Sequence, residues 1–238
     1  MRQILRCSLL FGVLIASSAG ASTFGVTPIR ADLTTSQRMA VITLTNSDAK
    51  SVVIQVQVEK WTQVNGVERL EYTREISATP PVLEVPAGAE QVIRVALRRA
   101  PDESQELTYR VIFQEMLQEA PKNFIGLQVA LRLSVPVFVA PSAGKPMSKL
   151  HWDVQAGAAG EIILGVLNEG TAHTQVSDLA LDLPAGAPPL VSNIAKYVLA
   201  GSRMSWTLKS PVLLTPSSPL TVHGHDAEGA FSQVVSVK

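Results

Sequence analysis

The sequence is poor in cysteine: Cys7 is the only one, and residues 1–21 have the pattern of a cleavable signal peptide. Two early arginines, a short apolar run over residues 9–16 and small residues ending at Ala21 make up this pattern. We expect cleavage after Ala21, which removes Cys7. The exported chain then has no disulfide scaffold, no cysteine-ligated zinc and no cysteine nucleophile.

Long apolar runs and an excess of one charge are also lacking. No stretch reaches the roughly 20 apolar residues of a spanning helix, so we expect no membrane insertion. The chain has 20 basic and 20 acidic residues, and loss of the two signal-peptide arginines leaves 18 (20 − 2) against 20, a net charge of −2. No basic field attracts nucleic acid.

Motifs for catalysis are missing as well. The sequence has no GxSxG elbow, no HExxH pair and no glycine-rich phosphate loop, so we expect neither an enzyme nor a cofactor. His223 and His225 would share one face of a strand, and Asp226 or Glu228 could add a third metal ligand. We prefer two solvated histidines beside a turn, which leaves a metal-binding or hydrolytic β protein as a minor alternative.

What the sequence does contain is a series of short β-strands separated by turns. The spacing of about 8–12 residues, without an amphipathic helix, predicts an all-β protein with antiparallel sandwiches of the immunoglobulin type. In the N-terminal half we expect strands at 24–33, 39–45, 52–61, 82–85, 91–98, 107–117 and 127–139.

A polar segment rich in proline and small residues divides the chain. We expect an N-terminal domain over residues 22–141, a linker over 142–149 and a second, smaller β domain over 150–238. In the second domain we expect strands at 151–154, 161–168, 174–183, 197–199, 204–208 and 220–223.

The strand expected at 127–139, LQVALRLSVPVFV, has the clearest pattern in the chain. Apolar residues occupy every odd position, which is the period of a strand with one apolar face. At roughly 3.3 Å per residue it would span about 43 Å, more than twice a typical strand. One small domain would not cover all of it, so the excess is a candidate surface for binding another chain.

This run, the preceding YRVIFQEM and the upstream ATPPVLEVPAGAEQVIRVALRR together resemble the PapD-like periplasmic chaperones of chaperone–usher pili. The resemblance covers the whole exported chain and is strongest over residues 24–141. It implies two immunoglobulin-like domains set at an angle, in the periplasm of a Gram-negative bacterium. Such chaperones lend their G1 strand to a pilus subunit that lacks its last strand, and later release the subunit to the outer-membrane usher.

Aligned on the family, G1 corresponds to the run at 127–139. The resemblance implies that the side chains inserted into the subunit are Leu127, Val129, Leu131 and Leu133, with an extension to Val135. The same edge could also pair two free chaperones.

Better-known members of the family hold the subunit's terminal carboxylate with an arginine on the first strand and a lysine on G1. Arg30 matches the first, but Pro136 stands at the lysine position. RLSVPVFV with YRV resembles the archaic branch, which makes Arg110 the candidate replacement. Arg94 and Arg132 are fallback candidates.

A second hypothesis of another class is a structural or adhesive protein built from two β-sandwiches. Pilus subunits carry an N-terminal donor extension and depend on a partner for folding. This chain begins its first strand almost at Phe24, directly after the signal peptide, and we expect it to fold alone. The sequence therefore favours the chaperone.

Overall fold

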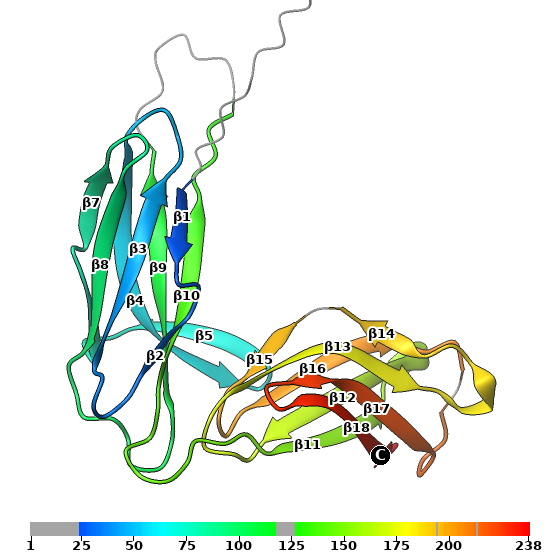
Figure 1. The fold of residues 1–238 in the computed structure, drawn as a ribbon. Helices are drawn as coiled ribbons and strands as arrows, with labels where there is room; N and C mark the ends of the chain where they lie inside the picture. The colour runs from blue at the N-terminus through cyan, green and yellow to red at the C-terminus, as the bar shows by residue number, and fades with distance from the viewer. Residues whose placement is uncertain (1–23, 118–126, 194, 213) are drawn as a thin grey trace, which may run out of the picture.

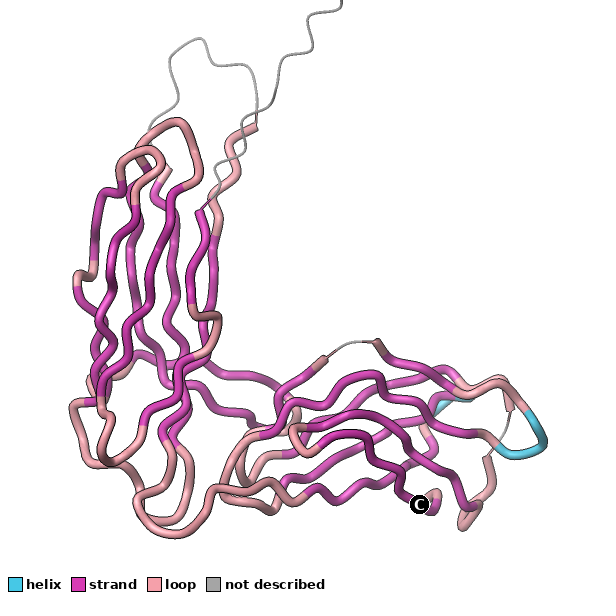
Figure 2. Tube along the Cα trace, in the orientation of Figure 1, coloured by secondary structure: helices cyan, strands magenta, loops and turns pink. Residues whose placement is uncertain are grey.

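A computed structural model describes residues 24–117, 127–193, 195–212 and 214–238. They form two β-sandwiches that meet in an L (Figure 1). Regular structure is almost entirely strand (Figure 2), which confirms the predicted all-β class with two sandwich domains. The predicted signal peptide, residues 1–21, lies outside the described residues. In the described part of the chain, no helix has the length and apolar character needed to cross a membrane.

The N-terminal sandwich consists of two facing sheets. One has the strand order β1-β3-β8-β6; the other has the order β2-β10-β9-β4-β5, with β7 also pairing with β4. The strands are β1 (Phe24–Thr27), β2 (Ala31–Leu33), β3 (Met39–Asn46), β4 (Val52–Val64), β5 (Val67–Tyr72), β6 (Ile76–Thr79), β7 (Val82–Val85), β8 (Glu90–Leu97), β9 (Leu107–Met116) and β10 (Arg132–Val139).

Alternation of apolar and polar residues builds the core between these sheets. In β4, Val52, Ile54 and Val56 are buried, while Gln55 and Gln57 on the other face are more exposed. Odd-numbered residues of β10 and β9 join the same core from the neighbouring strands. At the end of β4, Asn65 and Gly66 have φ of 52° and 78°, the values that a tight hairpin turn requires, and lead into β5. An Asn-Gly pair is typical of this turn, but strand β5 is not among the strands expected from the sequence.

The first strand changes sheets at a bend. Phe24–Thr27 pairs antiparallel with β3 in one sheet, and Ala31–Leu33 pairs parallel with β10 in the other. Residues 28–30 form the bend between them. The single strand expected at 24–33 is therefore two strands, because the residues around Pro28 are not part of either ladder.

The C-terminal sandwich has a sheet of order β11-β12-β16 and a second of order β14-β13-β17-β18, with β15 also pairing with β13. Its core contains Trp152, Leu164, Val222 and other apolar residues. The elements are β11 (Leu150–Ala156), β12 (Glu161–Asn168), β13 (Thr174–Asp182), β14 (Leu190–Ser192), β15 (Lys196–Val198), β16 (Arg203–Lys209), β17 (Pro219–Asp226) and β18 (Gly229–Ser236), with two 3-10 turns, η1 (Ala158–Gly160) and η2 (Pro184–Gly186).

A small apolar cluster joins the two sandwiches. Trp61 of β4 and Phe138 of β10 pack against Tyr197 and Leu199 of the C-terminal domain. The side chain of Gln63 donates to the carbonyl of Tyr197 at 2.8 Å and accepts from the N–H of Leu199 at 2.9 Å. The far end of β10 is therefore packed into both domains.

A buried contact between a histidine and a carboxylate lies beside this cluster. Nδ1 of His173 is 2.6 Å from Oε2 of Glu106, and their side chains are only 7% and 6% exposed. The same carboxylate oxygen accepts the backbone N–H of His173 at 2.9 Å. The imidazole ring stacks on Phe138 with a centroid distance of 3.4 Å. This pair connects the segment before β9 to the segment before β13 and fixes the junction.

Candidate functional site

Strand β10 has one fully covered edge and one largely open edge (Figure 1). On one side β9 pairs with all of Arg132–Val139. On the other side β2 pairs only with Val137–Val139. Among the residues that the structure describes, no strand pairs with residues 132–136 on that side. We call this stretch the open edge of β10.

The backbone of β10 alternates direction between these two edges. The N–H of Glu115, next to β9, donates to the carbonyl of Leu131 at 2.9 Å, so odd positions face β9. At the other end the N–H of Ala140 donates to the carbonyl of Leu33 at 2.9 Å, so even positions face β2. Arg132 and Ser134 therefore direct their N–H and C=O groups to the open edge.

Pro136 also directs its backbone to the open edge, where its missing N–H interrupts nothing in the β9 ladder. That ladder runs through the Pro136–Arg110 pair without a break. A proline within a strand can end or shift a backbone ladder, because it has no N–H. In the folded domain this restriction applies only to the edge away from β9.

The first predicted donor residues are exposed. Leu127 is 84% exposed and Val129 is 61% exposed, and neither belongs to a strand. The strand expected at 127–139 is thus wrong over its first five residues, because β10 begins at Arg132. Near Leu131 the β9 ladder ends in a side-chain contact: Oε2 of the buried Glu115 accepts the N–H of Leu131 at 3.0 Å.

The later donor residues turn progressively into the domain's own core. Leu131 and Leu133 are partly buried against that core. Val135 is 2% exposed and lies within the core, beside Val111 on the neighbouring strand β9. The predicted extension of the donated face to Val135 is therefore wrong. Odd side chains of β10 point between the two sheets and emerge only where the sandwich ends.

Arg110 is placed beside β10, as the sequence predicted. It lies on β9 opposite Pro136, and its guanidinium carbon is 3.7 Å from the centre of the Trp61 ring. Burial lowers the pKa of Arg110 below its ordinary value, although an arginine stays charged in proteins. The salt bridges of the described residues do not include Arg110. A guanidinium that lies over a ring still has N–H groups at its edge that can bind a carboxylate.

Arg30 lies on the same side of the domain but is already paired. Its Nη2 is 2.7 Å from Oδ1 of Asp32, and its guanidinium carbon is 5.0 Å from the ring centre of Phe138. Burial acts against the charged form, but the Asp32 carboxylate outweighs it and raises the pKa of Arg30. A ligand carboxylate would therefore compete with Asp32 at this position.

The two fallback arginines differ in position. Arg132 is exposed at the start of β10, opposite Gln114. Arg94 lies on β8 in the other sheet, between Val41 and Thr79 of the neighbouring strands, and faces solvent. Arg94 as an anchor beside β10 is therefore wrong, because the core separates its sheet from the site.

Several residues at the site were not found from the sequence. Trp61, Tyr197 and His173 surround the end of β10, yet they come from strands and loops far apart in the chain. An aromatic residue at an alternating strand position carries no signal that another domain will cover it. Their role in supporting Arg110 and Phe138 depends on the domain junction.

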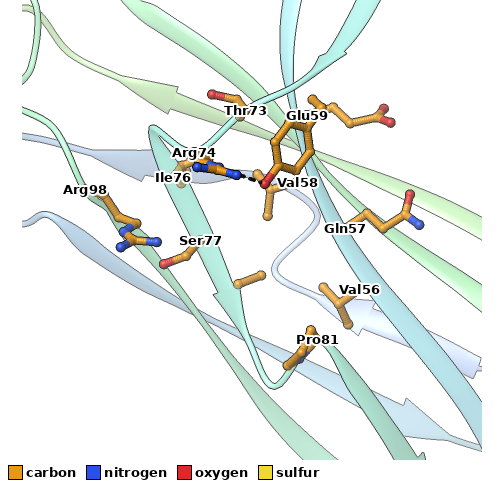
Figure 3. Close-up of a pocket in the computed structure, with 12 residues that line it drawn as sticks. Val56, Gln57, Val58, Glu59, Thr73, Arg74, Ile76, Ser77, Pro81 and Arg98 are labelled. Carbon is orange, nitrogen blue, oxygen red and sulfur yellow. Dashed lines mark hydrogen bonds between the residues drawn. The ribbon is translucent and has the colours of Figure 1, made fainter.

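A cavity of about 470 Å³ lies elsewhere, between β4 and β6 (Figure 3). Val56, Val58 and Ile76 line it with Arg98, and Nε of Arg74 lies 3.3 Å from the hydroxyl of Tyr72. β9 separates β4 from β10 in the sheet, so this cavity is on the far side of β4 from the open edge. No predicted site residue lines it.

The predicted histidine pair has other neighbours. Nε2 of His223 is 2.7 Å from Oδ2 of Asp182, and Nδ1 of His225 is 3.5 Å from Oδ2 of Asp178. In the part of the chain that the structure describes, no three His, Cys, Asp or Glu residues are grouped to hold a metal. Surface contacts with neighbouring acids account for both histidines.

A family model described as "Pili and flagellar-assembly chaperone, PapD N-terminal domain" matches residues 23–145, which is more than half of the chain. The chain belongs to this chaperone family. No curated protein is similar enough in sequence to give a significant match. The predicted family is confirmed, and its fold agrees with solved structures along nearly the whole chain.

Three solved chaperone structures illustrate the shared fold. The chaperone–tip subunit pre-assembly complex CsuC–CsuE, from archaic chaperone–usher Csu pili of Acinetobacter baumannii, matches with a TM-score of 0.68 at 20% identity, over 90% of this chain and 98% of the other. The CupB2 chaperone of Pseudomonas aeruginosa matches with 0.57 at 16%, over 90% and 100%. The Salmonella enterica SafA pilin–SafB chaperone complex matches with 0.60 at 13%, over 92% and 97%.

Proposed function

We propose that this chaperone holds a pilus subunit along the open edge of β10 by donor-strand complementation. The observation that carries the proposal is a combination of two features: Arg132 and Ser134 direct their backbone groups to an edge where no strand of the described residues pairs, and exposed apolar residues lie just before them in the chain. An exposed strand edge is the surface to which an extended chain adds by β-augmentation. Two of the chaperones with this fold are in complexes with a subunit.

The exposed apolar side chains supply the side-chain part of this binding. Leu127 and Val129 would enter the subunit, and burial of such side chains contributes about 1.5–3 kcal/mol each. Leu131 and Leu133 add the area that the chaperone core leaves uncovered. Backbone hydrogen bonds along the open edge give affinity that does not depend on the subunit's sequence.

Arg110 is the proposed anchor for the subunit's terminal carboxylate. It lies opposite Pro136, where the open edge ends, and its stacking on Trp61 holds the guanidinium in a fixed orientation. Charge-assisted hydrogen bonds to a carboxylate are strong and directional. Arg30, paired with Asp32, is a second basic group on this side of β10.

The remaining features of the proposal come from the family. We place the chaperone in the periplasm after removal of residues 1–21, in the archaic branch, with release of the subunit to the outer-membrane usher. Arg110 beside Pro136 supports the archaic assignment, because the usual G1 lysine is replaced there. Strand capture requires no catalysis and no cofactor.

Co-expression of the exported chain with a pilus subunit of the same organism tests the function. The tagged chaperone should retain the subunit in a one-to-one complex. Val129→Glu should lower recovery of the complex at least tenfold, because a charge would have to enter an apolar groove. Since Val129 is exposed, the variant chaperone should remain folded.

Val234→Glu is the matched control. Val234 is 68% exposed on β18, in the other domain and away from β10, so its replacement should leave recovery unchanged. Full recovery with Val129→Glu, or equal losses with both variants, would exclude capture along this strand.

A further inference from the structure

Strand β5 forms a second open edge, at the other end of the sheet from β10 (Figure 1). Among the residues that the structure describes, no strand pairs with the side of β5 that faces away from β4. All six residues of Val67–Tyr72 are exposed, so neither sandwich buries the strand. Its apolar side chains are uncovered as well, since Val67 is 61% exposed and Tyr72 is 79% exposed. An exposed edge of this kind is a surface on which another strand can pair.

The hairpin turn determines which residues of β5 direct their backbone to this edge. Val64 and Val67 flank the two-residue turn and lie opposite each other, and in such a hairpin the flanking pair is hydrogen-bonded. Val67 therefore directs its backbone to β4, and the direction alternates along the strand from there. The N–H and C=O groups of Glu68, Leu70 and Tyr72 thus point to the open edge.

Two oppositely charged residues of β5 lie two positions apart on one face of the strand. These are Arg69 and Glu71, and Leu70 between them points to the other face. The salt bridges of the described residues include neither Arg69 nor Glu71. A strand with this pattern is complementary to a reversed copy of itself.

Charge selects one register for a second copy of β5 that pairs antiparallel along this edge. When Leu70 lies opposite Leu70 of the second copy, Arg69 of each copy lies opposite Glu71 of the other. The neighbouring registers place Arg69 opposite Arg69, or Glu71 opposite Glu71. These positions form the non-hydrogen-bonded pairs, whose side chains are closest. Opposite charges there are favourable and like charges are destabilising, so the register centred on Leu70 is preferred.

We infer that two copies of this chaperone associate through β5, paired antiparallel about Leu70. The Leu70–Leu70 pair and the two Glu68–Tyr72 pairs exchange backbone hydrogen bonds, and the two Arg69–Glu71 pairs lie on the opposite face. The arrangement has two-fold symmetry, so it closes at a dimer. Because β10 lies at the other end of each sheet, its open edge stays available in both copies. The inference goes beyond the proposed function and does not depend on it.

Sedimentation equilibrium of the exported chain, without any subunit, tests the dimer. One short strand pair buries little surface, so we expect a Kd of about 10 μM to 1 mM. Arg69→Glu and Glu71→Arg should each raise this Kd at least tenfold, because both favourable pairs become repulsive. Both positions are exposed, so the variants should remain folded. The double variant Arg69→Glu/Glu71→Arg should dimerise like the unmodified chain.

Mixing the two single variants gives the sharpest result. Arg69→Glu carries only acidic residues at these two positions and Glu71→Arg only basic ones, so together they should form a heterodimer that neither forms alone. Arg94→Glu, an exposed charge reversal on the other sheet, is the matched control and should leave the Kd unchanged. Val129→Glu, next to β10, should also leave it unchanged, which distinguishes this dimer from one formed through β10.

The outcomes separate this inference from the proposed function. A chain that remains monomeric up to about 1 mM overturns the dimer. A dimer that Arg69→Glu does not weaken, or that Val129→Glu dissociates, overturns the role of β5. Absence of a heterodimer in the mixture overturns the register. Subunit capture is measured separately, so a chaperone that captures a subunit but never dimerises loses this inference and keeps the proposed function.

Discussion

The guanidinium carbon of Arg110 lies 3.7 Å from the centre of the Trp61 ring, on neighbouring strands of one sheet. Tyr197 from the second domain lies 5.5 Å from the same ring, edge to face. Arg110 thus packs on Trp61, and Trp61 packs on Tyr197 of the other domain. The orientation of the candidate anchor therefore depends on both sandwiches. This arrangement makes Arg110 the first residue to test.

Arg110→Ala should lower recovery of the chaperone–subunit complex at least tenfold, because it removes the proposed partner of the subunit's terminal carboxylate. Arg110→Lys should give an intermediate result, since a lysine keeps the charge but loses the planar stacking. Arg94→Ala, on the other sheet, is the control and should have no effect. Equal recovery with Arg110→Ala and the unmodified chaperone would remove Arg110 from the site.

Val135 and Val129 should respond in opposite ways to the same substitution. Val135→Glu places an unpaired charge in the core and should unfold the N-terminal domain or destabilise it by several kcal/mol. Val129→Glu should change the free energy of unfolding by less than about 0.5 kcal/mol, as is usual for surface positions. Denaturant titrations of the two variants measure this, and similar losses would contradict the boundary drawn between core and donor residues.

Glu106→Ala should destabilise the junction between the domains. Its carboxylate is buried with His173, and leaving a buried polar group without its hydrogen-bond partner costs about 1–3 kcal/mol. Glu169→Ala is the control, because Glu169 contacts Lys149 and His151 at an exposed position where such pairs contribute about 0–1 kcal/mol. Thermal unfolding of both variants should show a clear loss only for Glu106→Ala.

Glu75 should make stability depend on pH in the acid range. Burial acts against its charged form, but bonds from Tyr109 and Arg99, with Lys60 nearby, outweigh it and lower the pKa of Glu75. A carboxyl whose pKa is lower in the folded state stabilises above its unfolded value of about 4.3 and loses that contribution as the pH falls. Glu75→Gln should therefore cost more at pH 7 than at pH 3 in chemical denaturation; a constant difference would contradict this account.

Much of the strand pattern could be predicted, because in these strands apolar residues that face inward alternate with polar residues that face outward. Strands β3, β4, β8 and β9 lie where that alternation placed them. β5 could not be predicted in this way: all six of its residues are exposed, so it has no buried face to produce a pattern. Strand β18 was missed for a similar reason, since only Val235 among its residues is buried.

The candidate site was predicted in part. The sequence located the strand and the arginine next to it, since both lie in motifs of adjacent strands. It did not show where the apolar face of β10 changes from exposed to buried, because Leu127 and Val135 have the same parity. That change depends on where the facing sheet ends, which is a property of the tertiary structure.

Phe138 ends β10 within the joint between the domains, stacked on His173 and packed against Trp61. A partner held along the beginning of the strand, as proposed, would bind an element whose other end is packed against both sandwiches. The same strand thus contributes to the proposed binding edge and to the junction that sets the angle of the L.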